Sequence, residues 1–500
     1  MGYIRGLDRN QIILFPERLD DYISEENSVR ILDAYVNSLE LSDLGFTKAT
    51  PCDTGRPPYS PYEMLKLYIY GYMNRIRSSR RLEAETKRNV EVMWLMEKLS
   101  PDHKTIARFR KENASALKNV FRDFVKLCIK LGLYGKELVA IDGSKFKAVN
   151  SKDNNYNDEK LKDRIARLDT KIDEYMQQID EADKLENAAE NLKSPDEIKA
   201  ILSELISRKE LYQSYAEEMK QNGETQKSLT DPDSRRMMAN GKLDICYNVQ
   251  TSVDSKNKMI VTFDVGNNAQ DYNQLSPMAS ESAKILEAEN LTATGDKGYD
   301  SASDVAACIM QGINPHVADT NYDICLPTEI QVPKEVSEKE IPAENITGHT
   351  DGRCVYLPNR NIAVCPMGKI LYPSGYKKSH SAALFRNGRA CSACQCKCTK
   401  EQYKQFEIRM AKSEFTKEYD DKNIQLKQIH IKADKEIVKQ RKCIAEHPFG
   451  TIKRAMDAGY LLTKGFDNVI GEFSLSFLAY NIKRAINILG PKRIIEEIKS

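Results

Sequence analysis

Three acidic residues are candidates for metal-assisted phosphodiester chemistry. Asp142 follows an apolar run in VAIDGS, and Asp296 follows one in TATGDKG, so each is expected at the carboxyl end of a buried strand. Glu446, in AEHPFGTIKR, could complete the set. Carboxylate oxygens suit Mg²⁺ or Mn²⁺, and two such ions would activate a water and stabilise a leaving oxygen. Taken singly, either aspartate is also explained as a turn residue that ends a strand.

Cysteines are concentrated in one short region. Of the 12 in the chain, five are Cys365, Cys391, Cys394, Cys396 and Cys398. A C-x-x-C pair with further thiolates can bind Zn²⁺ tetrahedrally, as a structural site. Five candidates for four positions leave the ligand set open, with Cys396 the most dispensable. Reduced thiols in a loop are the alternative.

Basic residues gather at two places in the first part of the chain. The formal net charge of only +2 does not indicate nucleic acid, so any DNA contact must come from such local faces. These faces suit phosphate contacts, and a helix after a turn can enter a major groove. A solvated face with internal pairing to Glu83 and Glu85 is the alternative. The candidates for DNA contact are Arg75, Arg77, Arg80, Arg81, Lys104, Arg108 and Arg110.

The spacing of apolar residues predicts an all-α segment followed by an α/β unit. Residues 1–130 have helical periodicity, with Ser60 as an N-cap and Pro61 in the first helical position. Residues 137–318 alternate strands and helices, which is typical of a mixed sheet with helices packed on it. A heptad pattern within residues 157–222 predicts an inserted helical hairpin.

The last third of the chain is expected to be a loop-rich, cysteine-containing insertion at 320–400 and a helical segment at 401–490 that carries Glu446. A chain of 500 residues is long enough for two or three folded units. No apolar run approaches the roughly 20 residues of a membrane span, and the N-terminus lacks a signal-peptide pattern. We therefore expect a cytoplasmic, nucleoid-associated protein without a membrane partner.

Several motifs occur together in a characteristic order. AIDGSKFKAVN, YNVQTSVDS, GDKGYDS, EHPFGTIKR and SLSFLAYNIKR follow one another, and RPPYSPYEMLKLYIYGYM, RSSRRLEAETKRNVEVMWL and SPDHKTIARFRKEN precede them. As a set, covering nearly the whole chain, they resemble the DDE-type insertion-sequence transposases. The resemblance implies an RNase H-like catalytic domain behind a helical N-terminal domain, and it supports a cysteine knuckle.

Carried over to this sequence, the resemblance implies Asp142, Asp296 and Glu446 as the catalytic carboxylates. Related transposases have an arginine before the glutamate and a lysine seven residues after it. Lys453 matches that lysine, and Arg441 lies one residue from the arginine's expected position. Pro448 either kinks the helix of Glu446 or begins a new one.

The predicted function is therefore a DNA transposase that uses two Mg²⁺ or Mn²⁺ ions. It would cut the terminal inverted repeats of an element and join the 3′-hydroxyl to target DNA. Two ends must be brought together, so a dimer or higher oligomer is expected. An RNase H-like nuclease without strand transfer and a non-catalytic, transposase-derived DNA-binding protein are the alternatives.

Overall fold

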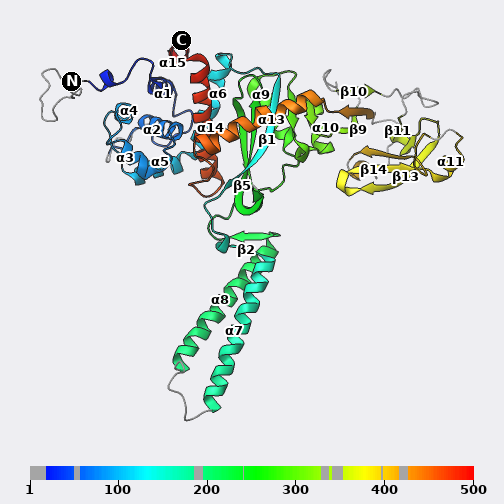
Figure 1. Cartoon of the computed structure of the whole chain (residues 1–500), viewed down its shortest axis with the longest axis horizontal. Coiled ribbons are helices and arrows are strands. Elements are labelled where there is room, and N and C mark those ends of the chain that lie inside the picture. The colour runs from blue at the N-terminus through cyan, green and yellow to red at the C-terminus, as the bar shows by residue number, and fades with distance from the viewer. Residues whose placement is uncertain are drawn as a thin grey trace, which may run out of the picture.

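A computed structural model describes residues 18–49, 57–184, 195–239, 241–327, 337–340, 353–395, 398–410, 412–415 and 426–499. Within these ranges the chain combines helical and mixed α/β parts, which confirms the α/β fold class (Figure 1). None of the helices in the described ranges is both long enough and apolar enough to cross a membrane.

The first part of the chain is helical, as predicted. Its helices are α1 (Ser28–Asn37), α2 (Pro61–Met73), α3 (Ser79–Glu85), α4 (Val90–Leu95), α5 (His103–Glu112) and α6 (Ala114–Lys130). The predicted start of α2 is confirmed, because the Ser60 side chain accepts a hydrogen bond from the Tyr62 N–H and Pro61 is the first helical residue. Asp102 caps α5 in the same way, at the Lys104 and Thr105 N–H groups.

A buried ion pair fastens these helices to the C-terminal part of the chain. Arg77, just before α3, donates to the carboxylate of Glu472 at 3.2 Å and to the Tyr460 carbonyl at 2.8 Å. Glu472 lies on α14 (Phe466–Leu489) and also accepts hydrogen bonds from the Thr463 N–H and hydroxyl. The two charges stay buried together because each has several partners.

The central sheet is mixed, with the strand order β4-β5-β1-β7-β8 and with β6 also paired to β5. β4 (Arg235–Ala239), β5 (Lys242–Asp254) and β6 (Ile260–Gly266) are joined antiparallel, and β5 pairs antiparallel with β1 (Leu138–Lys147). β1, β7 (Thr292–Gly295) and β8 (Asn314–Val317) run parallel. The parallel strands therefore end at the same edge of the sheet.

Helices pack against this sheet and complete its core. α9 (Leu275–Leu286) and α10 (Ala302–Met310) connect the strands, and α13 (Lys435–Gly450) contacts β1, β5 and β7. Phe146 of β1 packs edge-on to Phe473 of α14 at 4.7 Å between ring centroids. α15 (Pro491–Lys499) follows α14 and contacts α1.

The helix that carries Glu446 runs through Pro448 rather than beginning there. α13 continues to Gly450 and passes directly into a π-helix, η6 (Thr451–Ala455). Proline lacks an N–H and π-helical turns contain more residues than α-helical turns, so residues after Pro448 do not keep the α-helical spacing.

Two long helices occupy the region in which the heptad pattern predicts a hairpin. α7 (Asp158–Lys184) and α8 (Pro195–Gln221) pack on each other, and the pair projects away from the central sheet (Figure 1). At its base Tyr156, Tyr212 and Tyr215 cluster, and the Arg164 guanidinium lies 5.2 Å from the Tyr156 ring. Residues 185–194 lie outside the described part.

The region after residue 320 is a second sheet, so the prediction of a loop-rich segment was wrong. Its strands are β9 (Asn321–Pro327), β10 (Ser337–Glu340), β11 (Val355–Leu357), β12 (Ile362–Val364), β13 (Ile370–Lys377), β14 (Ala382–Arg386), β15 (Gln405–Arg409) and β16 (Leu426–Lys432). They are arranged in the order β10-β16-β9-β15-β14-β13-β12-β11. Leu371, Phe385 and Phe406 are among the buried residues of its separate apolar core.

The prediction that the chain is helical from residue 401 was also wrong up to Lys432. β15 and β16 occupy part of this segment, and the long helix α13 begins only at Lys435. The segments QFEIR and QIHIK alternate polar and apolar residues, which is the strand period of two. Their high charge belongs to the polar face of a sheet.

Candidate active site

The register of the parallel strands brings Asp142 and Asp296 to corresponding positions. Ala140 of β1 pairs with Thr294 of β7, and each aspartate lies two residues further along its own strand direction. Side chains two residues apart point to the same face of a sheet, so both carboxylates face the same space. β1 does not end at Asp142 as predicted; it extends beyond β7 and continues paired with β5 to Lys147.

Asp142 is largely buried and lies among charges of both signs. Burial raises the pKa of its carboxyl to about 6; the Arg441 guanidinium opposes this rise, and the nearby carboxylates of Asp296 and Asp271 add to it. Arg441 comes from α13, and its Nη1 lies 3.6 Å from Asp142 Oδ1. The site therefore holds negative charge that the protein compensates only in part.

Asp296 is held by the turn that follows β7. Its Oδ1 accepts a hydrogen bond of 2.8 Å from the Gly298 N–H, at the start of η3 (Lys297–Tyr299). A Cβ at position 298 would lie 2.9 Å from that same oxygen, so glycine allows the close turn. The side chain is only partly buried, and thus a ligand from solvent can reach it.

A third acid in this space, Asp271, was missed by the sequence analysis. It lies between β6 and α9, and its Oδ1 accepts hydrogen bonds from Gln250 at 2.6 Å and Asn248 at 2.7 Å. Lys145 Nζ lies 3.4 Å from both of its oxygens. An acid that follows a strand was the available signal, but the polar run NNAQDYNQ resembles a plain connection between elements.

A buried hydrogen-bond chain links Asp271 to the turn of Asp296. The Tyr299 hydroxyl donates to Gln250 Oε1, and the Gln250 amide donates in turn to Asp271. A Cβ at position 143 would lie 2.5 Å from both Asp271 Oδ1 and Gln250 Nε2, which explains why a glycine follows Asp142. Residues from β1, β5 and η3 thus fix one another around the two aspartates.

Lys453 is positioned next to the same strand. Its Nζ donates to the Ser144 hydroxyl at 2.6 Å and to the Lys145 carbonyl at 3.0 Å, and lies 4.3 Å from the centre of the Phe146 ring. Burial lowers the pKa of its ammonium group. The sequence-predicted Lys453 and Arg441 therefore both lie beside Asp142, from η6 and α13.

Glu446 lies on α13 but is not brought together with the two aspartates. Its side chain is exposed, whereas Ala445 and Pro448 on the same helix are buried against the sheet. In the described part of the chain, Glu446 does not form with Asp142 and Asp296 a group of acids that could hold a metal ion. The π-helix changes the rotation between Glu446 and Lys453, so the seven-residue spacing does not place these two residues on one face of a continuous α-helix.

Two parts of the chain match known protein families. A family described as "Transposase domain (DUF772)" matches residues 17–112, and one described as "Transposase DDE domain" matches residues 364–486. Two separate parts of the chain are thus similar to transposase domains, one of them to a DDE domain. Arg441, Glu446 and Lys453 lie within the DDE-domain match, while Asp142 and Asp296 lie between the two matches.

Other comparisons with this chain are less informative. No curated protein matches it. The cryo-EM structure of a piggyBac transposase synaptic complex with hairpin DNA aligns over 95% of this chain and 79% of that one, with 8% identity and a TM-score of 0.30. Similarity at this level supports no inference about the chain.

The cationic residues predicted to contact DNA fall into two groups in the structure. Arg77 and Arg110 are buried, Arg77 by its pair with Glu472 and Arg110 by a hydrogen bond to the Tyr72 hydroxyl. The Arg77 and Arg110 side chains therefore stabilise the fold and are not accessible to a DNA phosphate. The prediction that these two residues contact DNA was wrong. The remaining five are exposed: Arg75, Arg80, Arg81, Lys104 and Arg108.

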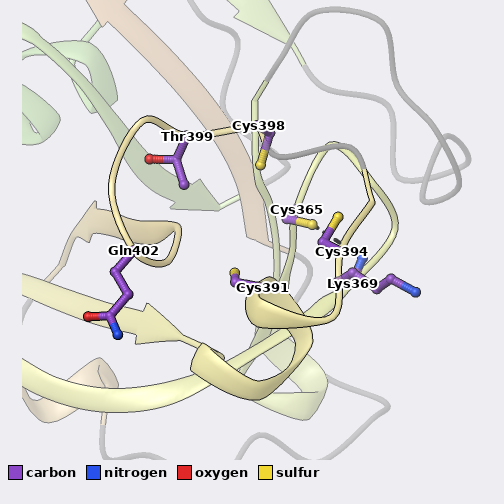
Figure 2. Close-up of a pocket in the computed structure, with 7 residues that line it drawn as sticks. All are labelled: Cys365, Lys369, Cys391, Cys394, Cys398, Thr399 and Gln402. Atoms are coloured by element: carbon purple, nitrogen blue, oxygen red, sulfur yellow. Dashed lines mark hydrogen bonds between the residues drawn. The ribbon is translucent and has the colours of Figure 1, made fainter.

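The four cysteines predicted as zinc ligands line one small cavity (Figure 2). Cys391, Cys394 and Cys398 lie on and after α11 (Gly388–Ser392), and Cys365 follows β12. The Lys369 N–H donates to Cys365 Sγ at 3.3 Å, and the Lys404 N–H donates to Cys391 Sγ at 3.4 Å. Burial and then the neighbouring Cys365 raise the pKa of the Cys398 thiol. Cys396 lies outside the described residues.

Neither site is arranged as a closed metal cage. Among the residues that the structure describes, no group of three or more His, Cys, Asp or Glu side chains is set to hold a metal ion. For Mg²⁺ this arrangement is adequate, because that ion commonly uses one or two carboxylates and takes its other ligands from water and substrate phosphate. The partly compensated charge of Asp142 and Asp296 fits such an ion.

The raised pKa of Asp142 leads to a prediction about stability. Ionising this carboxyl in the folded chain costs free energy, so its contribution to stability falls as pH rises from about 4 to about 6 and stays low above that. Replacing it by Asn removes the cost. Without divalent cations, we expect Asp142→Asn to be about 1–3 kcal/mol more stable than wild type at pH 7.5 and equal to it below pH 4.

Urea unfolding at the two pH values measures this difference. Asp264→Asn, an exposed aspartate on β6, is the matched control and is expected to change little. A variant at position 142 that is no more stable than wild type at pH 7.5 contradicts the electrostatic description of the site.

Proposed function

We propose that this chain is an insertion-sequence transposase whose central sheet is an RNase H-like catalytic core. The observation that carries the proposal is the meeting of Asp142 and Asp296 at corresponding positions of adjacent parallel strands. In the order β6-β5-β1-β7-β8, the pairs β6–β5 and β5–β1 are antiparallel, and the pairs β1–β7 and β7–β8 are parallel. This arrangement supports the assignment of the central sheet as an RNase H-like core. The substrate would be the DNA ends of a mobile element and a target DNA.

Asp142 and Asp296 would hold the divalent cations. When bound, these ions supply an activated water and stabilise the leaving oxygen. The chain's own residues orient the DNA: Arg441 and Lys453, both beside Asp142, are within reach of a phosphate bound at the two carboxylates. Cleavage would leave a 3′-hydroxyl at the element end, which would then attack a target phosphodiester.

The third carboxylate has two candidates. Glu446 follows from the family resemblance but is exposed on α13. Asp271 already lies next to Gly143 and close enough to Asp142 for its charge to act there. Glu446 would need a rotation of its side chain or of α13 when DNA binds, whereas Asp271 would need only to release Lys145.

DNA ends would also be held outside the catalytic site. The exposed cations before and on α3 and α5 form one candidate surface, with Asp102 capping α5 and Arg77 holding the segment on α14. Two copies would be needed to synapse two ends. The α7–α8 pair carries exposed apolar side chains, including Met176, Ile206 and Leu211, and is a candidate contact between copies.

A structural zinc ion at the cysteine cavity is the second metal that we propose. Cys365, Cys391, Cys394 and Cys398 supply the soft thiolates that zinc prefers. The backbone N–H groups donating to two of the sulfur atoms would stabilise thiolates there. The ion would join the loop after β12 to the segment around α11.

An RNase H-like nuclease without strand transfer would use the same carboxylates. Joining of a labelled element end to a plasmid separates the two functions, since only a transposase forms the joined product.

Strand cleavage tests the two aspartates. With labelled element ends and Mg²⁺, we expect Asp142→Asn and Asp296→Asn each to lower the cleavage rate more than about 100-fold, because even residues behind a metal ligand contribute about 10–100-fold. Asp264→Asn is expected to cleave like wild type. Wild-type rates in either site variant would refute the assignment, and the same assay on Glu446→Gln and Asp271→Asn identifies the third carboxylate.

Zinc content tests the cysteine site. Chain purified without added metal is expected to contain about one zinc per molecule by mass spectrometry, and Cys391→Ser is expected to lose most of it. Cys443→Ser, an exposed cysteine on α13, is the control and should keep its zinc. A metal-free wild type, or an unchanged content in Cys391→Ser, contradicts the proposal.

A further inference from the structure

One part of the second sheet is strongly basic. Residues 365–410 contain nine Lys and Arg against two Glu, a formal charge of +7, although the whole chain carries only +2. The rest of the chain is therefore negative by five units. A net positive charge of this size on so short a segment attracts a polyanion.

The two acids of this segment do not neutralise it. Glu407 is shared by Lys377 at 3.6 Å and His380 at 3.2 Å. Within the described ranges, no ion pair involves the exposed side chains of Lys369, Lys378, Arg389 and Lys400. Their charge is directed to solvent and available to a partner.

An aromatic side chain, Tyr372, lies on the solvent-exposed face of the same sheet. The strand register places Tyr372 of β13, Arg386 of β14 and Gln405 of β15 in one row, and all three are exposed. Their neighbours Leu371, Phe385 and Phe406 face the apolar core instead. Tyr372 is 53% exposed, and the Arg386 guanidinium in the same row lies 5.8 Å from the centre of the Tyr403 ring.

We propose that this face, formed by β13, β14, β15 and α11, is a second DNA-binding surface. Lys369, Lys378, Arg386, Arg389 and Lys400 would contact phosphates, and Tyr372 would pack on a sugar or base. An acidic protein would also suit the charge, but the exposed ring beside an arginine in a row across three strands favours a nucleic acid.

The surface is connected to the catalytic turn. Arg409, at the end of β15, pairs with Asp300 at 3.4 Å and lies 3.6 Å from the Tyr322 ring centre. Asp300 ends the turn that begins at Asp296 and also accepts a hydrogen bond from the Tyr322 hydroxyl at 2.8 Å. DNA held on the outer face would thus be fixed relative to Asp296. The N-terminal helices lie on the other side of the central sheet, so one DNA end could span both surfaces (Figure 1).

This inference rests on the proposed function for its choice of DNA, and its test measures binding without cleavage. The experiment uses the full chain with Asp142→Asn as the common background, and a labelled DNA duplex of the element's end titrated at several salt concentrations. The test variant adds Lys369→Glu, Arg386→Glu, Arg389→Glu and Lys400→Glu. The control variant makes the same charge change on α9 and α15, with Lys284→Glu, Lys492→Glu, Arg493→Glu and Lys499→Glu, all exposed residues.

We expect the test variant to bind at least about tenfold more weakly at 0.1 M salt than the background chain. The slope of log affinity against log salt should fall by about 2–4, close to 0.9 for each phosphate that the variant no longer neutralises. The control should match the background chain, and circular dichroism and thermal unfolding should show both variants folded. An unchanged slope in a folded test variant, or an equal loss of affinity in the control, overturns the inference. Failure of the background chain itself to bind the duplex would instead count against the proposed function.

Discussion

Two like charges held close together in a largely buried space are the feature on which the rest of this structure depends. Asp142 and Asp296 approach because adjacent parallel strands carry them to corresponding positions. Burial and neighbouring carboxylates make the ionised form of Asp142 unfavourable, and Arg441 offsets only part of that cost. The fold maintains an arrangement that a bound cation would favour, which is typical of a functional site rather than of a stabilising one.

The surrounding contacts can be understood as the means of keeping that arrangement. Tyr299, Gln250 and Asp271 form a buried chain between the turn of Asp296 and the strand of Asp142. An ion pair also joins each neighbouring unit to the central part: Arg77 with Glu472 for the N-terminal helices, and Arg409 with Asp300 for the second sheet. Units that would bind DNA are thereby fixed relative to the carboxylates, and positioning of this kind is a large part of phosphoryl-transfer catalysis.

The sequence was most informative where local pattern and chemistry agreed. The apolar runs before Asp142 and Asp296 predicted their strands, and Ser60-Pro61 predicted a helix start, because these signals involve only a few adjacent residues. Burial of Arg77 and Arg110 could not be predicted, since their partners Glu472 and Tyr72 are brought to them by tertiary packing. Asp271 was missed for the same reason, and the strands at 405–409 and 426–432 were obscured by their charged outer faces. The orientation of Glu446 depended on a π-helix that residue counting does not reveal.

Manganese binding measured by electron paramagnetic resonance tests whether Asp142 and Asp296 form a cation site, because it reports on the carboxylates without DNA. We expect the wild-type chain to bind Mn²⁺, and we expect Asp142→Asn and Asp296→Asn each to weaken this binding at least about tenfold while Asp264→Asn does not. Equal Mn²⁺ affinity in wild type and both site variants would contradict the proposed cation site.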